Sequence, residues 1–284
     1  MNKQADGIRY YFEEHNFKIR ILCFGELGKL FSDSFAKKLG EGFILQFVED
    51  SDELKQVITS DSKDEMLMLI TEYEPDIWKK HLDNEEIRII LEEVELTFIV
   101  IHPKNSIIPL DEHRLIQLMG GKENVNKLIL AMPVMNRKKS LETMCWAIYD
   151  MLAAISRPGY VTIDYTDLII PGQYDNWYGI VYEGECRNCR QLRQTAREIC
   201  AQVMKEVQPE DILSALMIIT TDRNETLMDI NNVALAFEKL FSDDTSLTWG
   251  HIQTDTECAI TLVLYCEMEE YDDCLNIIHR YSLQ

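Results

Sequence analysis

Positive charge is scarce in this sequence. Only 28 Lys and Arg stand against 49 Asp and Glu among 284 residues, which gives a formal net charge of -21. Phosphate backbones and anionic lipid surfaces attract dense basic stripes, so this charge excludes non-specific nucleic-acid binding and docking on an anionic membrane. The 46% of hydrophobic residues excludes a disordered acidic tail. The length suits one large domain or two that pack closely.

Long apolar runs are missing as well. No run approaches the roughly 20 residues that a transmembrane helix needs, so we expect no integral membrane span. The first residues, MNKQADGIRYYFEEHNF, are charged and lack the apolar stretch of a secretion signal. The expected location is therefore the cytoplasm.

Familiar catalytic and metal-binding motifs are also absent. No two of the six His stand four residues apart, and neither G-x-S-x-G nor G-x-x-x-x-G-K-[ST] occurs. Cys186 and Cys189 form a single Cys-x-x-Cys, without the second Cys pair or the His pair that a structural zinc site uses. We therefore expect no metal site, and we interpret this pair as thiols at the start of a helix. Most of the eight cysteines lie in apolar segments, which is typical of reduced, buried thiols.

The first half alternates short apolar runs with helical patterns. Apolar runs of about six residues predict strands at 19–24, 43–48, 66–71, 96–101 and 128–134. Between them, the residue pattern predicts helices at 26–39, 50–58, 75–93 and 111–118. This β-α-β-α order predicts an α/β fold, with a Rossmann-type parallel sheet covered by helices in a domain that spans 1–137.

The second half has a different pattern. A broad apolar stripe predicts a long helix at 138–156, so that 138–157 forms a central helix between the halves. We expect strands at 160–165, 178–182, 216–220, 247–252 and 259–266, and helices at 188–207, 228–241 and 270–281, which makes 158–284 an α+β domain. The helix at 188–207 carries a basic stripe that is either a solvated face or an interaction face for an acidic surface: Arg187, Arg190, Arg193 and Arg197.

Three local strings resemble the FtsZ/tubulin superfamily. After the predicted central helix, a Pro-Gly turn leads to residues 162–167 (TIDYTD), which are similar to Asn-Leu-Asp-Phe-Ala-Asp in FtsZ. Residues 218–220 (IIT) and 226–231 (TLMDIN) are similar to the family's Asn-Ile-Thr-Gly-Gly…Leu-Thr-Leu-x-Glu-Val-Asn. Trp249 and Gly250, followed by residues 260–264, resemble the family's Phe-Gly and its closing Val-Thr-Val-Ile strand. By element order the resemblance covers about residues 17–267 and implies an FtsZ/tubulin-like fold.

The resemblance also implies where the nucleotide would bind, and there the sequence departs from the family. FtsZ and tubulin hold the phosphates with a loop of the form Gly-Gly-Gly-Thr-Gly-Thr-Gly, whose backbone N–H groups approach the anion closely. The matching segment here, 72–78 (EYEPDIW), has no glycine and three carboxylates, Glu72, Glu74 and Asp76, which would repel a triphosphate. Of the first glycine loop only Gly25 and Gly28 remain. We therefore expect no cofactor, with GTP as the alternative.

The acidic pair that serves catalysis in the family is retained. In FtsZ-like filaments two aspartates after the central helix reach the nucleotide of the next subunit, and Asp164 and Asp167 match those positions. Their i, i+3 spacing is equally typical of an acidic pair that caps a helix or is solvated. Both interpretations stay open at this stage.

Three hypotheses for function follow. The first is a degenerate FtsZ/tubulin-like protein that has given up GTP in the usual mode and assembles with itself or with a functional FtsZ-like partner, in cell division or in membrane or cytoskeletal organisation. The second is a divergent FtsZ-like GTPase whose filaments bring Asp164 and Asp167 to the neighbour's active site. The third is an unrelated α/β small-molecule enzyme with its site at the carboxyl ends of the parallel strands.

Overall fold

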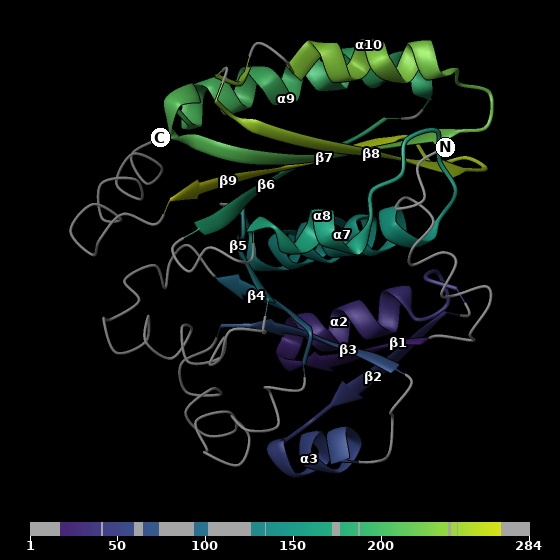
Figure 1. Cartoon of the computed structure of the whole chain (residues 1–284), viewed down its shortest axis with the longest axis vertical. Coiled ribbons are helices and arrows are strands. Elements are labelled where there is room, and N and C mark those ends of the chain that lie inside the picture. Colours follow the sequence, from purple (N-terminus) through teal and green to yellow (C-terminus); the bar gives the residue numbers. More distant parts are fainter. Residues whose placement is uncertain are drawn as a thin grey trace. The chain divides into compact units, whose positions relative to one another are not determined.

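The computed structural model describes residues 18–40, 42–59, 65–73, 94–101, 126–133, 135–171, 177–186, 188–237, 240–242 and 244–267. The chain divides into two compact units (Figure 1). The N-terminal unit contains the described residues within Tyr10–Cys145, and the C-terminal unit contains those within Trp146–Pro171 and Asn176–Met268. The expected helices at 75–93, 111–118 and 270–281 lie outside the described residues, as do Glu74, Asp76, Arg187 and Cys274.

The N-terminal unit is built on a parallel sheet in the order β2-β1-β3-β4-β5. The strands are β1 (Lys18–Phe24), β2 (Phe43–Val48), β3 (Glu65–Glu72), β4 (Leu96–Ile101) and β5 (Asn126–Ala131), with helices α2 (Gly25–Phe35) and α3 (Ser51–Thr59). The predicted Rossmann-type parallel sheet is confirmed. Asp50 caps α3, because its Oδ1 accepts hydrogen bonds from the N–H groups of Asp52 and Glu53 at 3.0 and 2.9 Å.

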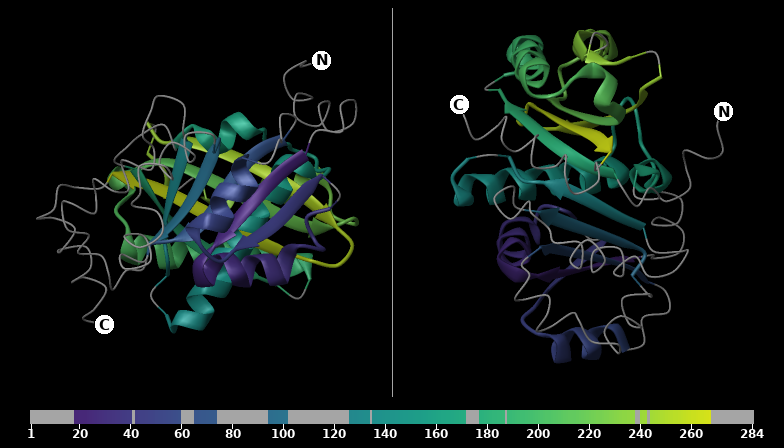
Figure 2. Two further views of the ribbon diagram at one scale, coloured as in Figure 1. Left: turned by 90° about the horizontal axis from the view of Figure 1, so that it is seen from below. Right: turned by 90° about the vertical axis from the view of Figure 1, so that its left-hand side faces the viewer.

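The C-terminal unit has a mixed sheet in the order β6-β9-β7-β8, formed by β6 (Trp177–Glu185), β7 (Ile212–Asp222), β8 (Ser246–Thr254) and β9 (Ala259–Glu267). Strand β9 pairs antiparallel with β6 and β7, whereas β7 and β8 are parallel. Helices α9 (Leu192–Glu206) and α10 (Leu227–Phe237) cover one face, and α8 (Tyr165–Ile169) and the end of α7 (Arg137–Ser156) lie on the other (Figures 1 and 2). The α+β character expected for this part is confirmed.

The predicted strand at 160–165 is wrong. No strand occurs between α7 and α8, and residues 157–164 run beside β8 in an irregular conformation. Single hydrogen bonds hold this segment, from the N–H of His251 to the carbonyl of Val161 at 2.8 Å and from the N–H of Gln253 to the carbonyl of Pro158 at 3.1 Å. The β-branched and aromatic residues in the segment mimic a strand, but Asp164 starts a helix instead.

The interpretation of Cys189 as a free thiol is also wrong. Cys189, at the start of the 3₁₀ helix η3 (Cys189–Gln191), forms a disulfide with Cys258, and the two Cα atoms are 5.6 Å apart. Free cysteines in the described part of the chain are Cys23, Cys145, Cys186, Cys200 and Cys266. Burial raises the pKa of the buried Cys145 to about 12 and that of the half-buried Cys200 to about 11, which makes both thiols unreactive.

None of the described helices has both the length and the apolar character needed to cross a membrane.

The side chain of Asp150 on α7 is a buried carboxyl group. It accepts a hydrogen bond from the Thr261 hydroxyl of β9, and burial raises its pKa from 3.8 to about 7. The pKa of Asp150 is higher in the folded than in the unfolded chain, so its protonated form stabilises the fold. This contribution to the free energy of unfolding is fully present below pH 4 and is lost as the pH rises through 7.

Asp150→Asn is therefore expected to become more stable relative to the wild type as the pH rises. The amide keeps an acceptor for Thr261 but carries no charge at any pH. Each pKa unit corresponds to about 1.4 kcal/mol, so the gain in unfolding free energy between about pH 5 and about pH 8 should exceed 1 kcal/mol. Urea unfolding of both proteins at the two pH values measures it. A difference that does not change with pH would contradict the assignment.

Candidate functional site

The N-terminus of α2 meets the end of β3 at the carboxyl edge of the parallel sheet. Strand β1 pairs with β3 so that Phe24 lies opposite Thr71. The residues that follow are therefore neighbours: Gly25 is the first residue of α2, and Glu72 is the last residue of β3. Ligands of such sheets bind at the carboxyl ends of the strands, so a nucleotide site would be expected at this edge.

The carboxylate of Glu72 caps α2. Its Oε1 accepts hydrogen bonds from the N–H groups of Glu26 at 2.9 Å and Leu27 at 3.4 Å, and the residue is only 3% exposed. Phe24 at the N-cap position supplies no side-chain bond of its own. The unpaired N–H groups and the positive end of the helix dipole attract an anion, and here a side chain of the same chain provides it.

Arg137, the first residue of α7, completes this arrangement. Its Nη2 lies 3.1 Å from Oε2 of Glu72 and 2.8 Å from Oε2 of Glu26, and its Nε donates to the same Glu26 oxygen at 2.9 Å. The buried charge of Glu72 is thus paired both with a guanidinium and with backbone N–H groups, as a buried carboxylate must be. We call Glu72, Arg137 and the N-terminus of α2 the carboxylate clamp.

The two expected phosphate-loop glycines both have structural reasons to be glycine. Gly25 has a φ of +78°, which side-chain-bearing residues rarely adopt. At Gly28 an added Cβ would lie 2.6 Å from the backbone carbonyl carbon of Cys23, so glycine there allows α2 to pack tightly on β1. Turn geometry and helix packing account for both glycines without a bound phosphate.

Asp164 and Asp167 form a capping box at the start of α8. Oδ1 of Asp164 accepts from the N–H of Asp167 at 3.1 Å, and Oδ2 of Asp167 accepts from the N–H of Asp164 at 2.8 Å. Burial raises the pKa of Asp167, while the hydrogen bond from the N–H of Asp164 acts in the opposite direction. The structure brings these two residues together, but they belong to the C-terminal unit and the two glycines to the N-terminal unit.

The sequence pattern does not point to Arg137, and Glu72 has a different role from the one predicted. The sequence predicts that Glu72 is one of three carboxylates that repel phosphate. In the structure it is the last residue of β3, and it is buried. Arg137 lies 65 residues further along the chain. No local sequence pattern predicts a pairing over that distance. The one indication is that the helix start at Gly25 has no capping side chain before it, so its N–H groups need an acceptor from elsewhere in the chain.

No protein-family model and no curated protein matches the sequence. Solved structures do match the fold. An empty FtsZ dimer from M. jannaschii matches with a TM-score of 0.63 and 12% identity, over 93% of this chain and 92% of the other. CetZ from Methanosaeta thermophila strain DSM 6194 matches with a TM-score of 0.57 and 9% identity, over 93% and 90%. The chain has the FtsZ/tubulin fold.

A third match extends this likeness to a filament structure. A GTPγS-form protofilament of TubZ from Bacillus thuringiensis serovar israelensis matches with a TM-score of 0.57 and 11% identity, over 98% of this chain and 95% of the other. The FtsZ/tubulin fold thus accounts for nearly the whole chain. At such identities the likeness shows the fold, and the function has to be argued from the site.

Proposed function

We propose that this chain is an FtsZ/tubulin-like protein that does not bind GTP in the usual mode and acts by assembling, with itself or with a functional FtsZ-like partner. The observation that carries the proposal is the carboxylate clamp. An anion already occupies the N-terminus of α2, and it is buried and covalently part of the chain. A phosphate would have to displace it and leave a charge without partners.

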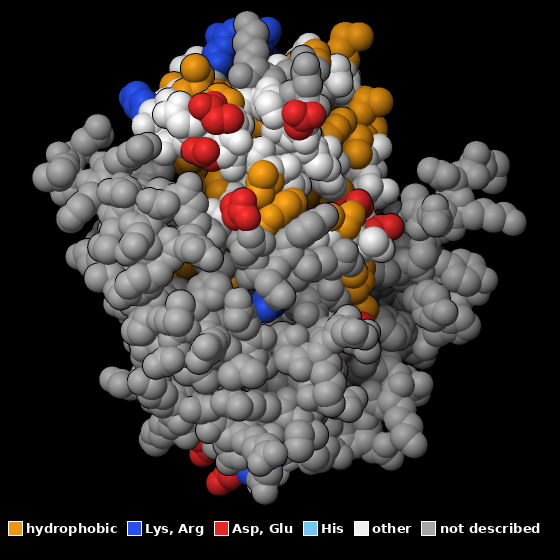
Figure 3. Space-filling view, turned by 60° about the vertical axis from the view of Figure 1, so that its left-hand side comes forward, with side chains coloured by type: hydrophobic (Ala, Val, Ile, Leu, Met, Phe, Trp, Pro, Cys, Tyr) orange, Lys and Arg blue, Asp and Glu red, His pale blue; other side chains and the backbone are white. Residues whose placement is uncertain are grey.

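Assembly is supported by the matched structures, which are described as a dimer for FtsZ and as a protofilament for TubZ. The chain also exposes large hydrophobic side chains on α9 and α10: Met204, Leu227, Met228 and Leu235 are 65%, 50%, 74% and 45% exposed. Figure 3 shows, on another view of the chain, hydrophobic side chains at the surface among charged ones in the described part. In this proposal these side chains belong to the surface that a partner covers.

Two measurements test the proposal. We expect no binding of labelled GTP to the wild type at micromolar concentrations, and sedimentation of the protein that is the same with and without GTP. Binding that is lost in Gly25→Ala would contradict the first expectation, since it would place the nucleotide at the N-terminus of α2. Glu26→Ala, which changes an exposed side chain beside the clamp, serves as the matched control.

The divergent GTPase remains the second candidate, and Asp164 and Asp167 favour it. Two carboxylates stand at the start of α8, and their sequence resembles the segment that carries the family's catalytic pair. Under this candidate, phosphate release rises with protein concentration and falls in Asp164→Ala. Because Asp164 also caps α8, the melting temperature of that variant has to be measured beside its turnover. Turnover equal to the wild type would exclude this role for Asp164.

A further inference from the structure

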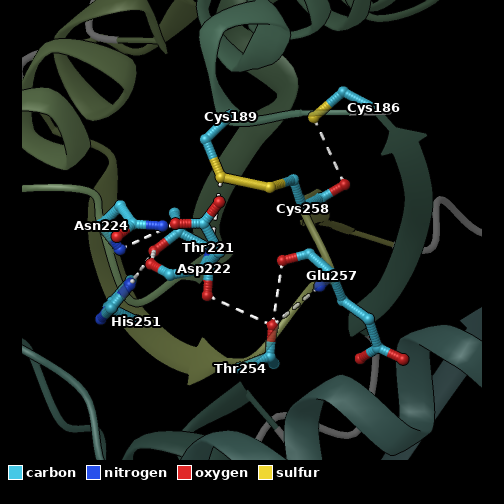
Figure 4. The surroundings of a disulfide bond; sticks show 9 residues. All are labelled: Cys186, Cys189, Thr221, Asp222, Asn224, His251, Thr254, Glu257 and Cys258. Carbon is cyan, nitrogen blue, oxygen red and sulfur yellow. Dashed lines mark hydrogen bonds between the residues drawn. A yellow bond between two sulfur atoms is a disulfide. The ribbon is translucent and has the colours of Figure 1, made fainter.

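Three side chains with metal-binding atoms meet in the C-terminal unit. Cys189 begins η3, Asp222 ends β7 and Cys258 directly precedes β9. One sulfur or carboxylate oxygen from each residue lies within 4.8 Å of the others. Figure 4 shows the three converging from separate segments around the disulfide. This group lies outside the carboxylate clamp and does not depend on the proposed function.

The donor set suits a thiophilic cation. Zn²⁺ binds Cys sulfur at about 2.3 Å and carboxylate oxygen at about 2.0–2.2 Å, so two ligand atoms in a tetrahedral site lie about 3.4–3.8 Å apart. Donor atoms already within 4.8 Å reach these separations by small side-chain rotations once the sulfurs are no longer bonded. Two thiolates and one carboxylate leave a fourth position for water.

The surroundings hold the three side chains in place, as outer-shell groups do in metal sites. The N–H of Asp222 donates to Sγ of Cys189 at 3.4 Å, and the N–H of Asn224 donates to Oδ1 of Asp222 at 2.7 Å. The carbonyl of Cys258 accepts from both the N–H and the thiol of Cys186, at 2.9 and 3.3 Å. Cys189 and Cys258 are 6% and 5% exposed. A cation here would be shielded and its ligands pre-oriented.

We propose that the reduced chain binds one zinc-like divalent cation through Cys189, Cys258 and Asp222. A thiol or phosphine reductant supplies two electrons and the disulfide takes up two protons, which gives two thiols. The cation then displaces those two protons and binds the thiolates. In a reducing compartment, cysteines in such an arrangement serve as metal ligands more often than as a disulfide. The sequence predicts no metal site, because it contains no second Cys pair or His pair near Cys186 and Cys189, and Cys258 lies 69 residues from Cys189.

The test is a metal titration of the full chain. The protein is reduced with a water-soluble phosphine, freed of metal, and shown to be fully reduced by thiol counting. We expect one equivalent of Zn²⁺ to bind, and Co²⁺ to give the sulfur-to-metal charge-transfer absorption of thiolate ligation. Cys258→Ser and Asp222→Asn should each weaken Zn²⁺ binding by about 100-fold or more, since loss of outer-shell partners alone costs roughly 10- to 100-fold.

Cys200→Ser is the matched control, because Cys200 is a free cysteine of α9 outside the donor set. It should bind Zn²⁺ like the wild type, and circular dichroism of all variants without metal should show the same fold. The proposal is overturned if the reduced chain binds no stoichiometric Zn²⁺, if Asp222→Asn and Cys258→Ser bind as tightly as Cys200→Ser, or if the disulfide stays closed in the folded protein under reductant.

Discussion

Gly159→Ala is expected to lower the free energy of unfolding of the C-terminal unit by about 3 kcal/mol or more, because the new methyl group would clash with the backbone of β8. An added Cβ would lie 1.7 Å from the backbone carbonyl oxygen of His251. The clash is with backbone atoms of β8, so no side-chain rotation relieves it. The segment that carries Gly159 or the strand itself would have to move.

Hydrogen bonds on both sides oppose such a movement. The N–H of Tyr160 donates to Nδ1 of His251 at 3.0 Å, which places the ring proton on Nε2, 2.8 Å from the hydroxyl of Thr221. Burial lowers the pKa of His251 to about 4, so the imidazole is neutral. Its two ring nitrogens link the N–H of Tyr160 to the hydroxyl of Thr221. Displacing Gly159 breaks this connection and the neighbouring bond from His251 to Val161.

Urea unfolding followed by circular dichroism and by tryptophan fluorescence measures the loss. Gly40→Ala is the control, because its φ is +95° and no atom lies within 4 Å of an added Cβ. It reports the cost of a left-handed backbone alone, about 1 kcal/mol. If Gly159→Ala cost no more than Gly40→Ala, the close approach to β8 would not exist in solution.

Local patterns predicted much of the fold. Strands β2 and β4 begin and end at the expected residues, since each is a short apolar run with clear breaks on both sides. The helix predicted at 26–39 instead ends at Phe35. Leu39 lies beyond that end but is still buried, at 4% exposure. Its apolar side chain therefore indicates burial and does not show that the helix continues.

The site was predicted less well, because it depends on pairings across the chain. Glu72 with Arg137 and Cys189 with Cys258 are separated by 65 and 69 residues, and neither pairing leaves a local pattern. Asp164 and Asp167 differ, because their i, i+3 spacing is itself local. The capping interpretation could therefore be stated from the sequence, and the capping box has that geometry.

Glu72→Ala is expected to cost about 2–3 kcal/mol of unfolding free energy in the N-terminal unit. The change removes charge-assisted hydrogen bonds to two backbone N–H groups and to Arg137, which are worth about 1.5–3 kcal/mol when buried. Glu72→Gln keeps an acceptor for the N–H groups but not the charge that pairs with Arg137 and with the helix dipole. The free energy of unfolding of Glu72→Gln should therefore fall by about 1 kcal/mol. Glu26→Ala should change stability by less than about 0.5 kcal/mol, because that side chain is 60% exposed.

The same variant also exposes the site that the carboxylate fills. In Glu72→Ala the N-terminus of α2 keeps its N–H groups and Arg137 keeps its charge, so a free anion has the partners that Glu72 had. Inorganic phosphate at millimolar concentrations should therefore raise the melting temperature of Glu72→Ala by mass action. The wild type and Glu72→Gln should show no such rise, because a side chain still fills the position. An equal rise in all three proteins would mean that phosphate acts elsewhere and that Glu72 does not occupy an anion site.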